Sequence, residues 1–218
     1  TIYFNSDKIE KISLGDVVGI KCKLENGKIL ATEFLYPNVP LRKDIAKTYE
    51  NVNCFFISDL YMDSEKFNKK SYEKFLEWIK KQEYENFFIF VLGNVSSNKE
   101  KTIEFFNNLP KNSFKIFVKN GNDEIKMADM IVNNPCMLKI GEVKILILNL
   151  QPQPNLSPKE FFLETLKRRY IKLGLMDTFI IDTIPDLVVC SGLNEIIEFN
   201  YKGITFLSTG NFISQPIF

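Results

Sequence analysis

The sequence predicts an α/β protein in which strands and helices alternate and a second group of strands follows. Val52–Ser58 and Asn86–Leu92 are apolar, aromatic-rich runs with the length of buried strands. Phe67–Lys81 lies between them and spaces its apolar residues at helical intervals. The three segments therefore predict a strand–helix–strand unit. Later in the chain, short strands joined by tight turns favour a second, antiparallel sheet.

Length, charge and cysteine usage exclude several classes of protein. With 218 residues, the chain can bury a sizeable core as one large domain or one domain with an appendage. The net charge of +1 gives no global attraction to nucleic acid or membrane, and no apolar run could span a bilayer. No signal peptide is evident. The cysteines lie singly, which argues against a local zinc motif and favours a reducing, intracellular compartment: Cys22, Cys54, Cys136 and Cys190.

Residues 1–40 are expected to form a small β region. Asp16–Lys23 alternates apolar and polar residues, and Lys28–Leu35 is its expected partner strand. Asn26-Gly27 between them is a strong signal for a two-residue hairpin turn. Two prolines then interrupt the strand pattern, and the polar residues 41–51 are expected to be a linker.

The remaining elements follow from apolar spacing and turn residues. Ser157-Pro158 starts a predicted helix that continues to about Lys172, with proline at its first position. A short helical piece is expected around Lys126–Asp129. The other predicted elements are a helix at Lys99–Leu109 and strands at Phe114–Val118, Cys136–Ile140, Val143–Leu150, Asp177–Asp182, Leu187–Cys190, Ile196–Phe199 and Ile204–Leu207.

Six short segments, in order along nearly the whole chain, resemble the B-subunit family of replicative DNA polymerases, closest to the small subunit of archaeal family D polymerases. They include FLYPNVP, then FFISDLYMDSEKF with FLEWI, and IVNNPCMLKIGEVKILI. LKRRYIKLG, IPDLVVCSG and YKGITFLSTGNF follow near the family's spacing. Each match is short, and their shared order makes the resemblance specific.

The resemblance implies a partial OB-type β region at 1–40, a linker at 41–51 and a calcineurin-like phosphoesterase domain at 52–218. Such a domain is a two-sheet metallophosphoesterase-like sandwich flanked by helices. In archaeal members it is a 3′–5′ nuclease in which two cations activate a water and stabilise the leaving oxygen. That chemistry requires carboxylates, an asparagine and several neutral imidazoles.

At the first two motifs this sequence departs from the family pattern. Asp59 occupies the position of the family's first ligand, directly after the strand Val52–Ser58, where α/β sheets bind ligands. Tyr61 stands where the family has histidine. Asn94 replaces the aspartate expected to bridge the two metals. The chain contains no histidine.

The later motifs have also lost their ligands. Asn122 and Asp123 match the family's Gly-Asn-His-Asp with the histidine deleted, and an ungapped register instead places Asn122 at the histidine. Asn149 lies near the family's His-Gly, while Gly192 and Asn194 lie within its closing Gly-His-x-His. We therefore expect an inactivated pocket with no catalytic residue, no metal ligand and no cofactor.

Several of these residues have simpler interpretations. Asp59 could cap a loop, and Asn122 and Asp123 have strong turn chemistry. A single Mg²⁺ held by Asp59, Asn94 and Asp123 is a further alternative, because Mg²⁺ accepts few protein oxygens and keeps waters. Basic residues at the end of the last predicted helix could contact phosphates or simply complement the helix dipole: Lys167, Arg168 and Arg169.

The expected function is that of a non-catalytic accessory subunit which scaffolds the large catalytic subunit of a replicative DNA polymerase. DNA contact would be indirect or weak, with no membrane, in the archaeal cytoplasm near the nucleoid or in a eukaryotic nucleus. The alternative is a divergent, active metallophosphoesterase or nuclease acting on DNA 3′ ends or nucleotides. It would need replacement carboxylates, for which Asp63 and Glu124 are the nearby candidates. A third interpretation is a binding module outside replication.

Overall fold

The computed structural model describes residues 1–4, 12, 15–42, 44–119, 127–150, 157–172, 178–193, 195–210 and 212. The chain forms two compact units: unit 1 contains residues 1–41 and 159–184, and unit 2 contains 42–158 and 185–218. The sequence placed 159–184 in the same domain as the rest of 52–218. The structure instead groups this segment with the N-terminal residues, and the backbone N–H of Asn38 donates to the carbonyl of Lys167 at 2.8 Å.

The first layer of unit 2 is a four-stranded parallel sheet with the order β4-β5-β6-β7. Its first three strands confirm the predicted runs, and the fourth was not predicted. The short helical piece predicted around Lys126–Asp129, just before this strand, is not helical at its described residues 127–129, which form a turn and a bend. The strands are β4 (Asn53–Ser58), β5 (Phe87–Leu92), β6 (Phe114–Lys119) and β7 (Met130–Asn133).

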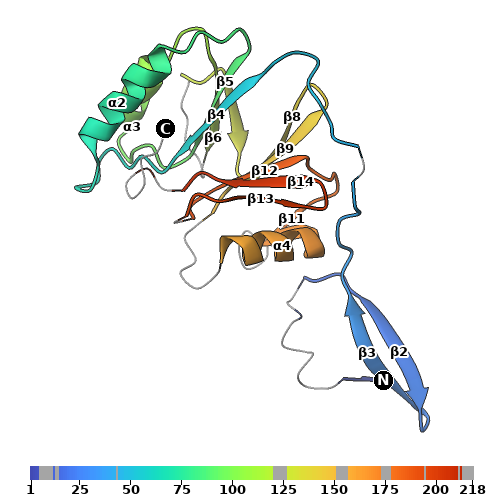
Figure 1. Cartoon of the computed structure of the whole chain (residues 1–218). Helices are drawn as coiled ribbons and strands as arrows, with labels where there is room; N and C mark the ends of the chain where they lie inside the picture. The colour runs from blue at the N-terminus through green and yellow to red at the C-terminus, as the bar shows by residue number, and fades with distance from the viewer. Residues whose placement is uncertain are drawn as a thin grey trace. The chain divides into compact units, whose positions relative to one another are not determined.

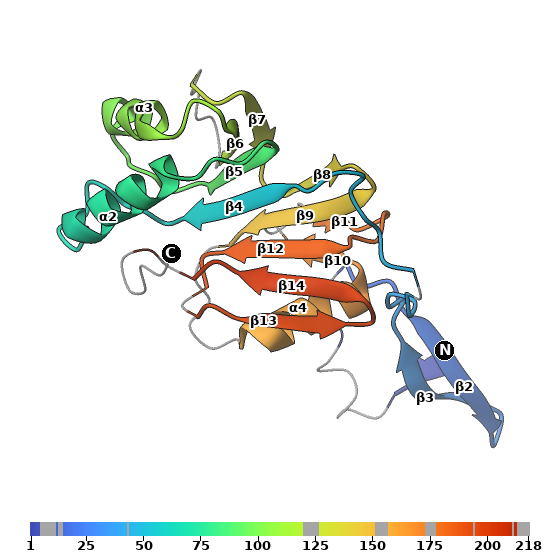
Figure 2. The same ribbon diagram turned by 45° about the horizontal axis from the view of Figure 1, so that its top comes forward.

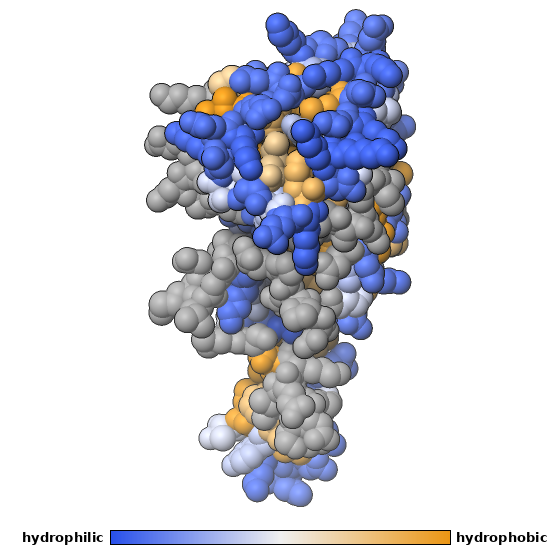
Figure 3. All heavy atoms as spheres, turned by 90° about the vertical axis from the view of Figure 1, so that its left-hand side faces the viewer, coloured by the Kyte–Doolittle hydropathy of each residue, from blue (hydrophilic) through white to orange (hydrophobic). Residues whose placement is uncertain are grey.

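Two predicted helices, α2 (Lys69–Lys80) and α3 (Lys99–Asn108), pack on one face of this sheet (Figure 1). Their apolar stripes point inward, and the face of unit 2 that carries them is largely hydrophilic (Figure 3). The buried cluster between helices and sheet is mainly aromatic and aliphatic: Tyr72, Phe75, Ile79, Phe105 and Phe106 from the helices, with Ile57, Phe87, Ile89, Val91 and Phe117 from the strands.

The second layer is a five-stranded sheet with the order β13-β14-β12-β9-β8 (Figure 2). The hairpins β8–β9 and β13–β14 are antiparallel, whereas β9–β12 and β12–β14 are parallel. The predicted antiparallel sheet is therefore wrong. A long crossover between β9 and β12 lets β12 enter parallel to β9, and β13 reverses the chain so that β14 runs parallel to β12. The strands are β8 (Cys136–Ile140), β9 (Val143–Asn149), β12 (Leu187–Ser191), β13 (Glu198–Tyr201) and β14 (Ile204–Ser208).

A second apolar cluster lies between the two sheets. Successive side chains in a strand point to opposite faces, so Phe90 and Leu92 of β5 face the second sheet while Ile89 and Val91 face the helices. Across the gap they meet residues of β9 and β12, notably Ile147. This arrangement confirms the predicted two-sheet α/β architecture.

Unit 1 contains a three-stranded sheet, in the order β1-β3-β2, and a helix followed by a small antiparallel pair. The predicted hairpin is confirmed, with Asn26 and Gly27 at φ of 51° and 72°. Whether this sheet is part of an OB fold stays a prediction. The elements are β1 (Ile2–Tyr3), β2 (Gly19–Glu25), β3 (Lys28–Leu35), α4 (Pro158–Arg168), β10 (Tyr170–Lys172) and β11 (Thr178–Ile180).

The last helix is shorter than predicted because Arg169 leaves the helical region with a φ of 59°. Its backbone N–H still closes the helix by donating to the carbonyl of Thr165 at 2.8 Å. The residues after it, which the sequence assigned to the helix, form β10 instead. None of the described helices is both long and apolar enough to cross a membrane.

The expected linker has no helix or strand among its described residues and belongs to unit 2 from Arg42 onward. The Arg42 guanidinium pairs with the carboxylate of Asp186, which also accepts the backbone N–H of Lys144 at 2.7 Å. The four cysteines are free thiols, of which Cys190 is buried and Cys54 half-buried.

Replacing the residue that caps α3 should cost stability. The Asn98 side-chain oxygen accepts the backbone N–H groups of Glu100 at 2.8 Å and Lys101 at 3.2 Å. We expect Asn98→Ala to lower the free energy of unfolding by about 1 kcal/mol, as at other helix caps. Asn107→Ala, the same change at an exposed position in α3, is the control and should be neutral in urea unfolding. Equal losses for both variants would contradict the cap assignment.

Candidate functional site

The loops that follow β4 and β5 carry three residues with left-handed backbone. Asp59, Tyr61 and Asn94 have φ values of 54°, 45° and 47°. Such values are uncommon outside glycine, and they persist where the surrounding structure holds the backbone in place. The two loops hold each other: the N–H of Tyr61 donates to the carbonyl of Asn94 at 3.0 Å, and that of Met62 to Val95 at 2.8 Å. The sheet thus brings three predicted site residues together at the carboxyl ends of its strands.

Asp59 lies at the centre of this site and is 1% exposed. One carboxylate oxygen accepts the side-chain amide of Asn94 at 2.7 Å, and the other accepts the backbone N–H of Gly192 at 3.0 Å. Burial raises the pKa of the Asp59 carboxyl, and hydrogen bonds from Asn94, Gly192 and the neighbouring Ser58 and Tyr61 oppose that rise. The carboxylate is therefore engaged by donors of the chain itself.

Gly192 forms part of the wall of this site. Its φ is +81°, and a Cβ at this position would lie 1.8 Å from the carbonyl oxygen of Leu150. A side chain cannot be accommodated there without moving backbone. Glycine at 192 therefore allows the end of β12 to approach both the end of β9 and the carboxylate of Asp59.

Asn149, at the end of β9, is bound by the chain's own groups as well. Its side-chain amide donates to the carbonyl of Leu92 at 3.3 Å. Its backbone forms a reciprocal pair with Asn134, whose side chain accepts the Asn149 N–H at 2.8 Å and donates to the Asn149 carbonyl at 2.7 Å. Asn134 was not singled out in the sequence, although it lies in the Asn-Pro segment that carries the family resemblance.

Hydroxyl groups that sequence reasoning missed complete the site. The hydroxyls of Ser58 and Thr209 lie 2.7 Å apart, which links the end of β4 to the chain after β14. The Ser191 hydroxyl is fully buried and has no hydrogen-bond partner within the described part of the chain. The signal available in the sequence was small polar residues directly after apolar strands, in Ser-Asp, Cys-Ser-Gly and Ser-Thr-Gly.

The remaining predicted residues are not part of this group. Asn122, Asp123 and Asn194 lie outside the described residues, as does Glu124. Asp63, the other candidate carboxylate, is exposed and accepts the backbone N–H of Ser97 at 3.2 Å. The basic triplet Lys167, Arg168 and Arg169 belongs to unit 1.

Two members of that triplet have acidic partners. The ammonium group of Lys167 lies 3.1 Å from the carboxylate of Glu164. The guanidinium of Arg168 lies 3.3 Å from Glu164 and 2.6 Å from Asp16, whose side chain is fully buried. These charges are compensated within unit 1, which weakens the suggestion that Lys167 and Arg168 contact phosphates.

The side chains described at this site are not a suitable set of ligands for a pair of divalent cations. Such a site needs several anionic or imidazole ligands with free lone pairs. The chain has no histidine, Asn94 offers an uncharged amide, and each carboxylate oxygen of Asp59 already accepts a hydrogen bond. Among the described residues no group of three or more His, Cys, Asp or Glu side chains could hold a metal ion.

No protein-family model matches this chain, and no curated protein matches it. Solved structures do resemble it. Wild-type Vps29 complexed with zinc, from Entamoeba histolytica, is 17% identical, with a TM-score of 0.47 over 72% of this chain and 73% of that one. A protein of unknown function from Aquifex aeolicus, AQ665, is 17% identical, with a TM-score of 0.44 over 75% and 91%. Vps29 from Cryptosporidium parvum is 19% identical, with a TM-score of 0.44 over 72% and 73%. The likeness concerns the arrangement of strands and helices alone.

Proposed function

We propose that this chain is a non-catalytic accessory subunit of a replicative DNA polymerase that scaffolds the large catalytic subunit. The observation that carries the non-catalytic part is the state of Asp59. Its two carboxylate oxygens accept hydrogen bonds from Asn94 and Gly192 in a site that is closed to solvent. A carboxylate bound in this way connects the loops after β4 and β5 with the end of β12. It belongs to no group of three or more potential metal ligands among the described His, Cys, Asp and Glu residues.

The polymerase partner is supported by the ordered resemblance along the chain. The segments that carry it include those that build the site: the loop after β4 with Asp59, the stretch with Asn134 that leads into β8, and the end of β12 with Gly192. The resemblance and the site chemistry agree on a phosphoesterase-type architecture whose ligand positions have been filled by other residues.

Lack of nuclease activity is the first test. Purified protein should not release nucleotides from a 3′-labelled single-stranded DNA in the presence of Mn²⁺, because no imidazole ligands remain. The matched control is Asp59→Asn, which keeps the size of the side chain and removes its charge. Cleavage by the wild type that disappears in Asp59→Asn would overturn the non-catalytic assignment, since contaminating nuclease would survive the substitution.

Partner capture is the second test. The tagged full chain, expressed in its own cells, should co-purify with a large polymerase subunit at a fixed stoichiometry that withstands nuclease treatment. A preparation that consistently contains other proteins and no polymerase subunit would instead favour a binding module outside replication.

A further inference from the structure

A cavity of about 300 Å³ lies within unit 1, where the end of α4, the strands β10 and β11 and two N-terminal segments meet. Its volume is at the lower end of the range for small-molecule sites. The walls are mostly apolar and come from Val17, Pro37, Tyr170, Ile180 and Ile181. Val17 and Ile180 are 74% and 63% exposed, so aliphatic surface is left uncovered here.

One of the two arginines that line the cavity has its charge compensated. The guanidinium of Arg168 binds both oxygens of Asp16, at 2.8 and 2.6 Å. The Asp16 carboxylate also accepts the hydroxyl of Tyr170 at 2.8 Å. Arg168 and Asp16 thus form a closed ion pair that fixes this wall and offers no unpaired charge to a ligand.

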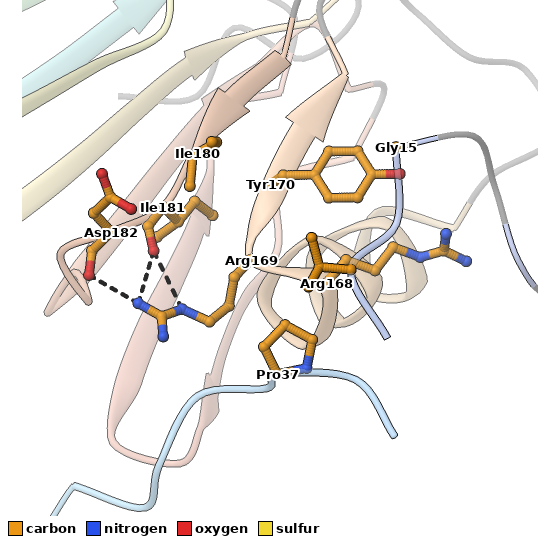
Figure 4. A pocket seen from close by; sticks show the side chains of 9 residues that line it. Gly15, Pro37, Arg168, Arg169, Tyr170, Ile180, Ile181 and Asp182 are labelled. Carbon is orange, nitrogen blue, oxygen red and sulfur yellow. Dashed lines mark hydrogen bonds between the residues drawn. The ribbon is translucent and has the colours of Figure 1, made fainter. Parts of the chain in front are cut away.

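Within the described part of the chain, the side chain of the second arginine, Arg169, binds backbone carbonyls only. Its Nε donates to the carbonyl of Ile181 at 3.2 Å, and its Nη2 donates to Ile181 at 2.9 Å and to Asp182 at 2.8 Å (Figure 4). No ion pair in the described part of the chain includes Arg169. A guanidinium has five N–H groups, so three are used, and the two on Nη1 have no partner among the residues that the structure describes.

The position of this cation is fixed. The left-handed backbone of Arg169 lies between two main-chain hydrogen bonds, from its N–H to Thr165 at 2.8 Å and from the N–H of Ile181 to its carbonyl at 2.9 Å. A half-buried guanidinium held by neutral oxygens beside an apolar wall is a suitable partner for an anion, because an ion forms stronger hydrogen bonds than a neutral acceptor.

We propose that this cavity binds a small organic carboxylate, with its apolar body against Val17, Pro37 and Ile180 and its carboxylate on the Nη1 N–H groups of Arg169. A monoanion fits better than a phosphate. The carboxylate of Asp182 also lines the cavity, and its charge disfavours a doubly charged phosphate more than a monoanion. The carboxylate could belong to a free acid or to the last residue of a peptide.

The test is a titration of the full chain, labelled at its isoleucine methyl groups, with phenylacetate. Signals of Ile180 and Ile181 should shift with a dissociation constant in the approximately millimolar range expected for a ligand of this size. Phenylacetamide, the neutral analogue, should bind at least about 10-fold more weakly, because it cannot form the charged hydrogen bonds. Equal binding of the amide, or equally tight binding of inorganic phosphate at these residues, would overturn the proposal.

The source of the carboxylate is tested with N-acetylphenylalanine, which presents the end of a peptide. Binding as tight as that of phenylacetate assigns the cavity to a peptide C-terminus, and much weaker binding assigns it to free acids. Either result retains the carboxylate site.

Matched variants test the residues. Arg169→Gln should weaken phenylacetate binding about 10-fold, whereas Lys172→Gln, which removes a positive charge from exposed β10, should not. Val17→Asp should weaken binding more than Val17→Asn, because both lose the apolar wall and only the first adds a repelling charge. This pair remains informative if Arg169→Gln does not fold. Unchanged binding in Arg169→Gln, or equal effects of the two Val17 variants, would refute the assignment.

Discussion

Gly192→Ala is expected to lower the free energy of unfolding by about 4 kcal/mol or to prevent folding, which is the range of the most damaging single substitutions. The new Cβ would lie 1.8 Å from the carbonyl oxygen of Leu150. Relief requires moving the end of β12 away from β9, which also removes the Gly192 N–H from Asp59. Urea unfolding followed by circular dichroism measures the loss.

The control for this substitution is Gly27→Ala in the β2–β3 hairpin. Gly27 has a similar φ of +72°, but nothing lies within 4 Å of the position of its Cβ. Gly27→Ala should lower the free energy of unfolding by about 1 kcal/mol, because it causes backbone strain and no steric contact. If both alanine variants lose the same amount, the contact between Gly192 and Leu150 does not determine the stability of the site.

Asp59→Ala should be the second most damaging change at the site, lowering the free energy of unfolding by about 3 kcal/mol. It leaves the amide of Asn94 and the N–H of Gly192 buried without their acceptor. Asp63→Ala removes an exposed carboxylate four residues later and should cost about 1 kcal/mol or less. Similar losses for Asp59→Ala and Asp63→Ala would show that Asp59 has no special structural role.

The Asp59 carboxyl should also make the stability of the protein depend on pH. Burial raises the pKa of Asp59, so the folded chain keeps a proton that the unfolded chain loses at about pH 4. The stability that this carboxyl contributes is therefore fully present below its unfolded pKa and is lost as the pH rises through its folded pKa. Relative to Asp59→Asn, the wild type should lose stability between about pH 4 and the folded pKa, as measured by unfolding across that range. A constant difference would contradict a raised pKa.

Local patterns predicted the framework of unit 2 well. The run at β4, the stripe of α2 and the aromatic β5 each have a period or length that only one element type satisfies. Asp59 could also be placed from sequence, because it directly follows a buried strand. These features depend on neighbours in the chain, so a single sequence contains them.

The features that the sequence did not reveal depend on distant contacts. The segment of β10 was predicted to be the end of a helix. Its pairing with β11 and the left-handed backbone of Arg169 make it a strand instead. β9–β12 pairing is parallel because of a crossover whose direction no short pattern encodes. Likewise, the donors that bind Asp59 and Asn149 come from Gly192 and Asn134, which no local spacing connects to them.

The bond from Gly192 to Asp59 spans 133 residues, and that between Thr209 and Ser58 spans 151. During synthesis β4 leaves the ribosome long before Gly192 and Thr209 have been made. The carboxyl end of β4 therefore stays exposed until the last strands have been synthesised. Closure of this site should therefore be a late event in biogenesis, and nascent chains that stop before residue 192 would be the species that chaperones and proteases meet.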